Sequence, residues 1–402
     1  RGDDDDKSID TIKYIKYIVR NAKNLKLILL SATPMYNTAD EIIELLNLLL
    51  ANDNRIDDDT KDIFKNGKLV DENLFKQKIK GYVSYIKGET SDKFPEKLYP
   101  VENIIKMDHS KLNIYNCPMN NSNIQYKKYL ETYTELVKDG KELQLKDEKI
   151  LMQLSNITYP NNKTDILKYY GKKGLKEMFN IHDNVYKYKS GVEKIFNKKH
   201  IYKYSSKIDA LLKKLETSEG VVFIYSQYIQ SGIIPIMLAL EQNGYSNYSG
   251  NNILNDKSKT DNGYKYISIT ADKNISKNND KEIKDCISID NVNGQKIKII
   301  LGSNVASEGL DLKYIREIHI FDPWYHLKKI EQIIGRGIRY CSHMELPKDK
   351  RDTTIYMYAS TIPDNNDKSI DLKIYNIAEK KNNEIVKVEK ILQDNAIDKD
   401  IF

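Results

Sequence analysis

The sequence predicts an α/β protein built around a mainly parallel β-sheet. Six short runs rich in β-branched residues have the length and composition of buried strands, and amphipathic helical patterns lie between most of them. Strands that alternate with helices in this way form βαβ units, in which neighbouring strands run in one direction. The chain has 402 residues, of which 40% are hydrophobic, so we expect two or three structural units.

The predicted strands are each bounded by turn residues or by a change of hydrophobic period. They are 26–30, 221–225, 266–269, 297–301, 317–321 and 354–358. Helical spacing of apolar residues marks 40–50, 207–215, 327–338 and 370–392. Residues 55–204 are rich in lysine and tyrosine, with helical patterns at 73–86, 122–138 and 147–156, and they predict a mostly helical insertion.

The composition argues against a disulfide-rich or membrane protein but does not indicate a ligand. Charged residues make up 30% of the chain and the net charge is +6, so charge alone does not indicate nucleic-acid binding. Cys117, Cys286 and Cys341 are too few and too far apart for a disulfide framework, and we expect no metal site. Because no apolar run reaches the roughly 18 residues of a membrane span, we expect a soluble, intracellular protein without a membrane partner.

The segment Gln332-Ile-Ile-Gly-Arg-Gly-Ile-Arg339 carries the strongest functional signal. In a helix, Gln332, Arg336 and Arg339 share one face. Gly335 and Gly337 flank Arg336, and each costs about 1 kcal/mol relative to alanine inside a helix, so we expect a close approach to the backbone there. Guanidinium groups bind phosphate oxygens in pairs, which predicts a nucleotide γ-phosphate as the ligand. Ordinary surface arginines are the alternative, but they leave both glycines unexplained.

A second polar segment follows the predicted strand 297–301. Ligands of parallel sheets bind at the carboxyl ends of strands, where the loop 302–312 begins. We expect Ser303 to hold a nucleic-acid phosphate, Asp311 to accept a ribose hydroxyl, and Glu308 to order nearby basic groups. An ordinary strand-to-helix connection with a capping serine is the alternative for this loop taken alone.

Two hydroxyl residues follow the first predicted strand. Ser31 and Thr33 lie in the run Ser-Ala-Thr-Pro, where the proline ends any regular structure. A loop of this kind suits the sensing of a bound ligand, and a plain turn is the alternative.

Together these segments resemble the later motifs of superfamily 2 helicases. Ser31-Ala32-Thr33 resembles motif III, Val222 to Gln227 motif IV, Gly302 to Asp311 motif V, and Gln332 to Arg339 motif VI. Similarity to the Swi/Snf-related branch lies in residues 31–37 with 41–49, in 94–97, 117–119 and 125–126, and in 322–324. Residues 31–37, 335–343 and 378–381 look most like helicase-like ATPases of large DNA viruses, relatives of the poxvirus early transcription factor small subunit and nucleoside triphosphatase I.

The resemblance implies a RecA-like parallel-sheet helicase C-terminal lobe together with a remnant of a first RecA-like lobe. The implied parts are 1–54 as that remnant, 55–204 as the insertion, 205–363 as the second lobe, and 364–402 as a C-terminal helix packing on the second lobe. In this family the second lobe donates arginines to ATP, which implies catalytic roles for Arg336 and Arg339. The implied ATP-binding residues are Gln332, Gly335, Gly309, Asp311 and Glu308, and those for nucleic-acid binding or coupling are Ser31, Thr33, Ser226 and Ser303.

The first half of the family's ATP site has no counterpart in the sequence. No Gly-x-x-x-x-Gly-Lys-Ser/Thr loop occurs, and no strand ending in Asp-Glu precedes Ser31. We therefore expect a C-terminal fragment that is inactive alone, whose intact parent uses ATP and Mg²⁺ to move along nucleic acid, with the Mg²⁺ ligands absent from these residues.

The resemblance also implies the setting of the intact parent. The Swi/Snf-like features favour DNA over RNA, and the viral likeness implies a role in viral transcription. Viral RNA polymerase or transcription factors are then the expected protein partners, in the host cytoplasm or the virion. An RNA helicase and a non-catalytic scaffold subunit of a transcription complex are the alternatives.

Overall fold

The computed structural model describes residues 4–55, 62–85, 92–161, 165–256, 261–277, 279–304, 310–363 and 365–399. These residues form two compact units, each described below by itself. The first unit contains the described residues up to 85, residues 325–329, and those from 377 onward. The second contains 92–324 and 330–376, so the boundary falls inside two helices, α10 (Leu327–Gly337) and α11 (Ile370–Asp394).

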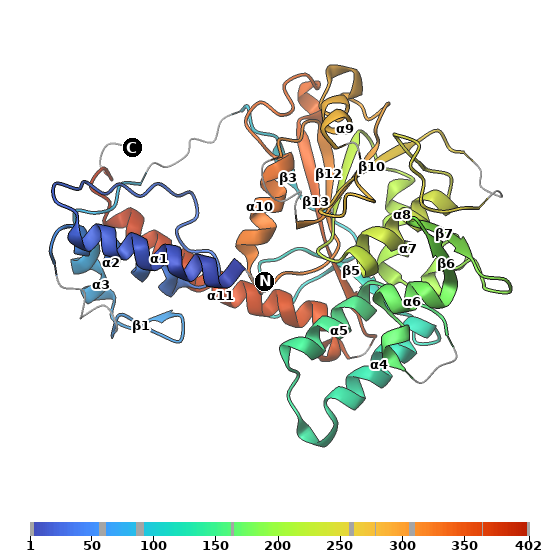
Figure 1. Ribbon diagram of the computed structural model, residues 1–402, viewed down its shortest axis with the longest axis horizontal. Coiled ribbons are helices and arrows are strands. Elements are labelled where there is room, and N and C mark those ends of the chain that lie inside the picture. Colours follow the sequence, from blue (N-terminus) through green and yellow to red (C-terminus); the bar gives the residue numbers. More distant parts are fainter. Residues whose placement is uncertain are drawn as a thin grey trace. The chain divides into compact units, whose positions relative to one another are not determined.

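A nine-stranded sheet forms the centre of the second unit (Figure 1). Its strands lie in the order β4-β5-β13-β12-β8-β11-β10-β9, and β3 pairs with the same strand, β13. Their bounds are β3 (Glu96–Leu98), β4 (Ile104–Ile105), β5 (Ile114–Pro118), β8 (Val221–Tyr225), β9 (Ser246–Asn247), β10 (Lys265–Ile269), β11 (Ile299–Gly302), β12 (Ile315–Ile320) and β13 (Asp352–Thr361). Neighbouring strands are parallel except β4 and β5, which confirms the predicted α/β fold.

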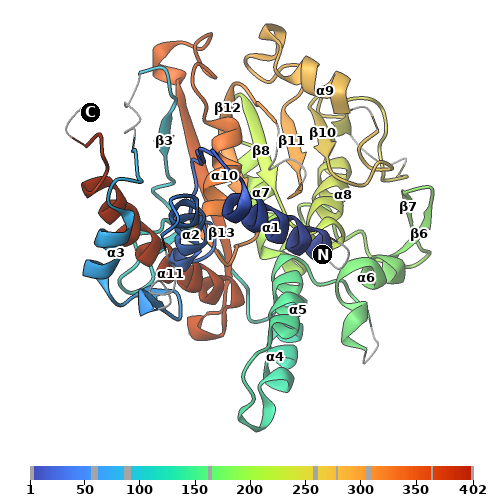
Figure 2. The ribbon, with the colours of Figure 1, turned by 60° about the vertical axis from the view of Figure 1, so that its left-hand side comes forward.

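Helices cover both faces of this sheet, which explains the continuous apolar character of its central strands. Every residue of β8 and β11 is buried, as expected for parallel strands with both faces covered. Figures 1 and 2 show α10 on one side of the sheet and α7 (Ser206–Leu215) and α8 (Ile234–Gln242) on the other. The Ser205 hydroxyl accepts the Ile208 N–H at 3.0 Å and so caps the start of α7. The helix α9 spans Asn279–Cys286.

The stretch expected to be a mostly helical insertion also supplies strands. Its helices are α4 (Ile124–Leu136), α5 (Leu145–Asn156) and α6 (Gly171–Met178), and a hairpin joins β6 (Phe179–His182) to β7 (Val185–Tyr188). In addition, β3, β4 and β5 belong to the central sheet. The short strand β5 ends at Pro118 and pairs with β13 over its whole length, a partnership with a segment more than 200 residues away that no local pattern reveals.

One predicted strand is absent from the described chain. Five of the six predicted runs coincide with β8, β10, β11, β12 and β13, but residues 26–30 form no strand. The side chains of Ile28 and Leu30 are 69% and 92% exposed. A strand is held by hydrogen bonds to a neighbour, and the described residues of the first unit pair no strand with this segment.

The first unit is mainly helical. It contains α1 (Asp4–Asn21), α2 (Ile42–Asn52), α3 (Glu72–Ile79), the hairpin of β1 (Phe64–Lys65) and β2 (Lys68–Leu69), and the later part of α11. Its core includes Met35, Ala39, Leu46, Leu50, Ile63, Phe75, Ile385 and Val388. The expected C-terminal helix is divided between the units: α11 belongs to the second unit up to Asn376, and from residue 377 onward it packs in the core of the first unit.

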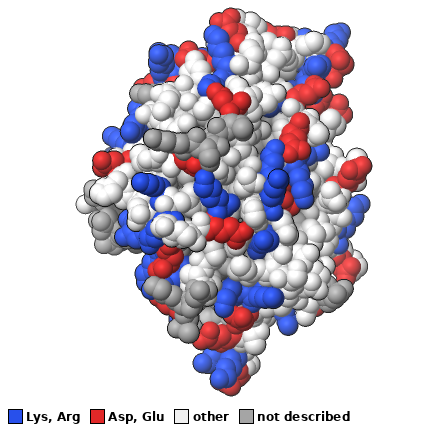
Figure 3. Space-filling view, turned by 90° about the vertical axis from the view of Figure 1, so that its right-hand side faces the viewer, with Lys and Arg blue, Asp and Glu red and all other residues white. Residues whose placement is uncertain are grey.

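Surface composition adds little to the identification of a ligand. The face shown in Figure 3 carries lysine and arginine side chains interspersed with aspartate and glutamate. Within the described ranges, no helix combines the length and the apolar character that crossing a membrane requires.

Candidate functional site

Three strands of the second unit end at one edge of the sheet and bring polar residues together. The ladder continues past the strands, because Ser226 N–H donates to the Gly302 carbonyl at 3.1 Å and Ser303 N–H donates to Ile269 at 3.1 Å. Asp322 follows β12 at the same edge, since it accepts hydrogen bonds from residues after β8. Open parallel sheets bind ligands at this edge.

The Ser226 side chain is hydrogen-bonded to the buried carboxylate of Asp322. Its hydroxyl donates to Asp322 at 2.9 Å, and Gln227 N–H donates to the same carboxylate at 2.7 Å. Burial raises the pKa of Asp322 above its ordinary value, while Lys207 and the hydrogen-bond donors act in the opposite direction. Because Ser226 is fully buried, its hydroxyl is closed to direct contact with nucleic acid in this conformation. A coupling role for Ser226 stays a prediction.

A buried lysine links this edge to two helices. Lys207 Nζ lies 2.7 Å from the Asp371 carboxylate and donates to Asn156 Oδ1 at 2.9 Å, and both charged side chains are fully buried. Asn156 in turn donates to Asp322, so the network joins α5, α7 and α11 to the strand end. The sequence analysis missed these residues. The sequence did indicate that Lys207 is buried, because it lies one helical turn before Leu211 on the apolar face of α7.

Arg336 and Arg339 lie near the end of α10 but not on one helical face. The helix ends at Gly337, so the predicted common face holds for Gln332 and Arg336 and excludes Arg339. Arg339 nevertheless folds back, since its Nε donates to the Gly335 carbonyl at 3.2 Å. Both guanidinium groups therefore lie at the end of α10, Arg336 as part of the helix and Arg339 through its hydrogen bond back to Gly335.

The segment after the predicted motif V loop runs beside these arginines. Arg339 forms an ion pair with Asp311, Arg336 Nη1 lies 3.5 Å from the Leu310 carbonyl, and Leu312 N–H donates to the Arg336 carbonyl at 3.1 Å. The side chains of Asp311 and Arg339 are 70% and 37% exposed, so the pair is open to solvent. Glu308 and Gly309 lie outside the described residues, and the ribose contact of Asp311 stays a prediction.

Ser342 and His343 fix the turn that carries Arg339. The Ser342 hydroxyl accepts the Arg339 N–H at 3.3 Å and lies 2.9 Å from the Nδ1 atom of His343. The Nε2 atom of His343 is 2.9 Å from the Ile315 carbonyl, which can only accept, so Nε2 carries a proton. Burial lowers the pKa of His343, which favours the neutral ring. The sequence analysis used residues 335–343 only for the family resemblance and missed the structural role of Ser342 and His343.

The two glycines of the segment have different surroundings. A Cβ atom at Gly337 would lie 3.1 Å from Ile315 Cβ and 3.1 Å from Ile318 Cδ1, so this glycine lets the helix approach β12. The close approach predicted for Gly337 is therefore made by the protein itself. At Gly335 no described atom lies within 4 Å of a Cβ position, and the approach of a ligand there stays a prediction.

The structure separates the remaining predicted residues into different places. Gly337 packs beside the start of β12, whereas Asp322 follows the end of that strand, so the arginines and the strand-end serines are not one cluster. Ser303 is buried. Ser31 and Thr33 belong to the first unit, where the Ser31 hydroxyl accepts the Thr33 N–H at 3.1 Å. That contact is typical of a serine turn, and the nucleic-acid role of these three residues stays a prediction.

Comparison with known proteins gives a family match and viral relatives. The helicase conserved C-terminal domain family matches residues 206–341. A protein of Acanthamoeba polyphaga mimivirus, named as a candidate ATP-dependent RNA helicase, is 30% identical over 361 residues, which cover 85% of this chain and 55% of that protein. Nucleoside triphosphatase I of Melanoplus sanguinipes entomopoxvirus is 29% identical over 384 residues, which cover 91% of this chain and 54% of that protein.

Among solved structures, the C-terminal part of the Fun30 ATPase domain is a remote likeness. It has a TM-score of 0.42 and 15% identity, and the match covers 73% of this chain and 97% of that chain. The chain spans between 36% and 55% of the length of three viral helicase relatives.

Proposed function

Because this chain belongs to the superfamily 2 helicases, with nucleoside triphosphatase I of entomopoxviruses among its relatives, we propose that its intact parent is an ATP-dependent nucleic-acid translocase. The resemblance predicted from the motifs is confirmed at the level of the family. The substrate, the direction of movement and the biological setting belong to the proposal.

The observation that supports this proposal most strongly is the pair of arginines at the end of α10. Arg339 is half-exposed and its Asp311 partner is largely exposed, so an incoming phosphate competes with a solvent-screened ion pair. Gly335 is in the last turn of the same helix, and no described atom lies within 4 Å of its Cβ position, so there is room for a ligand. Planar guanidinium groups suit the oxygens of a transferring phosphoryl group, and we propose ATP with Mg²⁺ as the nucleotide.

Replacing Arg339 in the intact parent tests this role. An arginine that stabilises the phosphoryl-transfer transition state contributes on the order of a thousandfold to the rate, so Arg339→Ala should lower kcat for ATP by about that factor. Thermal unfolding should change little, because the Arg339–Asp311 pair is exposed. Lys348→Ala, at an exposed lysine nearby in sequence, is the matched control and should keep full activity. Equal loss of activity in both variants would remove Arg339 from the mechanism.

For the nucleic acid, we propose that duplex DNA is the track. The support is the likeness of residues 322–324 and of the region before the second lobe to DNA translocases of the Swi/Snf-related branch. Movement along a strand needs contacts to the backbone rather than to bases, so binding should weaken steeply with salt, by a slope of about 0.9 per phosphate contact on a double logarithmic plot.

An RNA helicase is the second candidate, and the name of the mimivirus relative favours it. Filter binding and ATP turnover measured across a salt series, with duplex DNA, single-stranded DNA and RNA in parallel, separate the two. Stimulation of turnover by duplex DNA supports the translocase, whereas stimulation by RNA alone supports the helicase. A flat salt response would contradict both.

A further inference from the structure

A cavity of about 580 Å³ in the second unit is lined by none of the residues predicted to bind ATP or nucleic acid. Four pieces of chain enclose it: the helix α6, the β6–β7 hairpin, the turn at Ile229–Ile233 after β8, and the loop that follows β10. A volume of this size is typical of a small-molecule site. Two of the four pieces, α6 and the hairpin, come from the predicted insertion rather than from the sheet.

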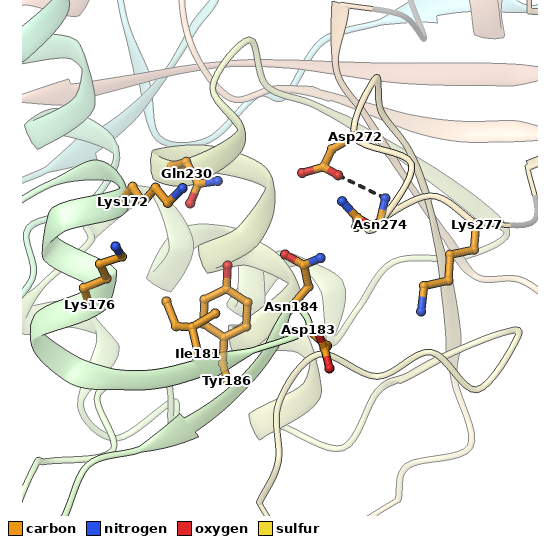
Figure 4. Close-up of a pocket in the computed structure, with 10 residues that line it drawn as sticks. All are labelled: Lys172, Lys176, Ile181, Asp183, Asn184, Tyr186, Gln230, Asp272, Asn274 and Lys277. Atoms are coloured by element: carbon orange, nitrogen blue, oxygen red, sulfur yellow. Dashed lines mark hydrogen bonds between the residues drawn. The ribbon is translucent and has the colours of Figure 1, made fainter.

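Three lysines line the cavity together with two aspartates, Asp183 and Asp272. Lys172 and Lys176 stand one helical turn apart on α6, and Lys277 lines the cavity from the loop after β10 (Figure 4). Among the described residues, none of these three ammonium groups forms an ion pair. Lys172 also lies in the first turn of its helix, where the helix dipole disfavours a cation. A bound anion would offset that unfavourable placement.

Neutral polar groups converge on the same space. Figure 4 shows the Tyr186 hydroxyl and the Asn184 amide pointing into the cavity, with Gln230 on the wall above them. Tyr186 is only 4% exposed, yet within the described chain its hydroxyl has no hydrogen-bond partner. Burial, together with the charge of Asp272, raises the pKa of Tyr186 to about 12, so the hydroxyl remains a donor at neutral pH. The hydroxyl faces the cavity, where a bound ligand can accept its hydrogen bond.

The walls are held firmly, which favours a preformed site. The Tyr186 ring packs edge-on against Phe179 with 5.6 Å between ring centroids, and its N–H donates to the Ile253 carbonyl at 2.6 Å. The Asp272 carboxylate accepts the Asn274 N–H at 3.0 Å and thereby shapes the loop opposite α6. The Gly171 N–H at the start of α6 donates to Ser231 at 3.0 Å.

We propose that this cavity binds a nucleotide, with Lys172 and Lys176 contacting its phosphate and with Tyr186, Asn184 and Gln230 hydrogen-bonding to its sugar or base. Lysine ammonium groups bind phosphate as point charges, and amide side chains match the donor and acceptor edges of bases. The nucleotide is either free in solution or one unit of a nucleic-acid strand, because both sources offer the same chemistry. The site is separate from the proposed ATP contact at Arg339.

Calorimetric titration of the 402-residue chain without ATP tests the proposal. The two probes are adenosine monophosphate and a single DNA strand of about ten nucleotides. Lys172→Ala and Lys176→Ala should each weaken binding about tenfold, as expected for a charged hydrogen bond. Tyr186→Phe should weaken it about fivefold while keeping the ring in place. Lys173→Ala is the matched control, because Lys173 is the adjacent exposed lysine of α6 and does not line the cavity.

The two probes distinguish a free nucleotide from one unit of a nucleic-acid strand. Binding of the monophosphate that depends on Lys172 identifies a free nucleotide, and binding of the strand alone with the same dependence identifies a unit of nucleic acid. Equal losses in the Lys172 and Lys173 variants, or no binding of either probe, would overturn the proposal. Loss of binding in Arg339→Ala but not in Lys172→Ala would place the ligand at the arginines, which also overturns the cavity while leaving the proposed function intact.

Discussion

Replacing Lys207 with methionine tests whether a buried ion pair holds the strand-end network together. Lys207 and Asp371 are both fully buried, with 2.7 Å between the ammonium nitrogen and the carboxylate oxygen, and Lys207 also donates to Asn156 at 2.9 Å. Methionine keeps a long apolar stem and removes the charge. Asp371 would then stay buried with donors from Ser155 at 3.0 Å and the Ser360 N–H at 2.8 Å.

The magnitude follows from what the variant leaves behind. Removing one partner of a buried ion pair costs about 3–5 kcal/mol. The two donors that remain on Asp371 place the loss near the lower end, at about 3 kcal/mol, and the acceptor left without a donor on Asn156 adds about 1 kcal/mol. We therefore expect the free energy of unfolding of the second unit to fall by about 4 kcal/mol.

Urea denaturation followed by tryptophan fluorescence measures this loss. Trp324 is the single tryptophan of the chain and belongs to the second unit, so its signal reports that unit. Lys213→Met is the matched control on the same helix, because Lys213 is 72% exposed and its pair with Asp209 contributes at most about 0.5 kcal/mol. Lys207→Met combined with Asp371→Asn should recover most of the stability, because the amide carries no charge and its oxygen can still accept the Ser360 N–H.

Two results would refute the reasoning about Lys207. The first is a loss within about 1 kcal/mol of the control, which would mean that water or a rearrangement satisfies Asp371. The second is a double variant that is no more stable than Lys207→Met alone, which would mean that packing rather than charge pairing explains the loss.

Further predictions concern the end of α10. Because burial lowers the pKa of His343 below 6.5, the unfolded chain binds the proton more readily, so His343 contributes stability above pH 6.5 that is lost as the pH falls further. The slope is at most about 1.4 kcal/mol per pH unit, and it should be smaller in His343→Gln when Trp324 fluorescence is followed in urea at several pH values. Gly337→Ala should destabilise the second unit by about 1–2 kcal/mol through overpacking against β12, whereas Gly335→Ala should stabilise it by up to about 1 kcal/mol. If Gly335→Ala in the intact parent keeps full ATP turnover, no nucleotide approaches that backbone.

The central strands were predictable because strands buried on both faces consist of continuous apolar residues, which the sequence shows directly. Val221–Tyr225 and Ile299–Gly302 are continuous apolar runs, and both are wholly buried in the sheet. Residues 26–30 have the same composition and form no strand. Composition reports the tendency to be buried, but a strand also needs a hydrogen-bonded neighbour, and a local pattern does not say whether one exists.

The site was predictable only where its contacts are local. The helical spacing of Gln332 and Arg336 follows from sequence, but the return of Arg339 across the helix end depends on a break at Gly337 that the apolar pattern hides. The buried contacts of Lys207 and Asp322 were missed because their partners come from segments far along the chain. A buried polar network is defined by tertiary contacts, so its members look like ordinary surface residues in the sequence.

The strand β12 connects the two halves of the candidate site. At its start, the Ile315 carbonyl accepts hydrogen bonds from His343 at 2.9 Å and from the Thr353 hydroxyl at 2.7 Å, and so anchors the turn that carries Arg339. Its end leads to Asp322, which holds Ser226. A strand of this length spans about 20 Å and is rigid when paired on both sides, as β12 is by β8 and β13. The strand therefore does not deform when the arginines move, and the exposed Arg339–Asp311 pair is the part that can rearrange when a phosphate arrives.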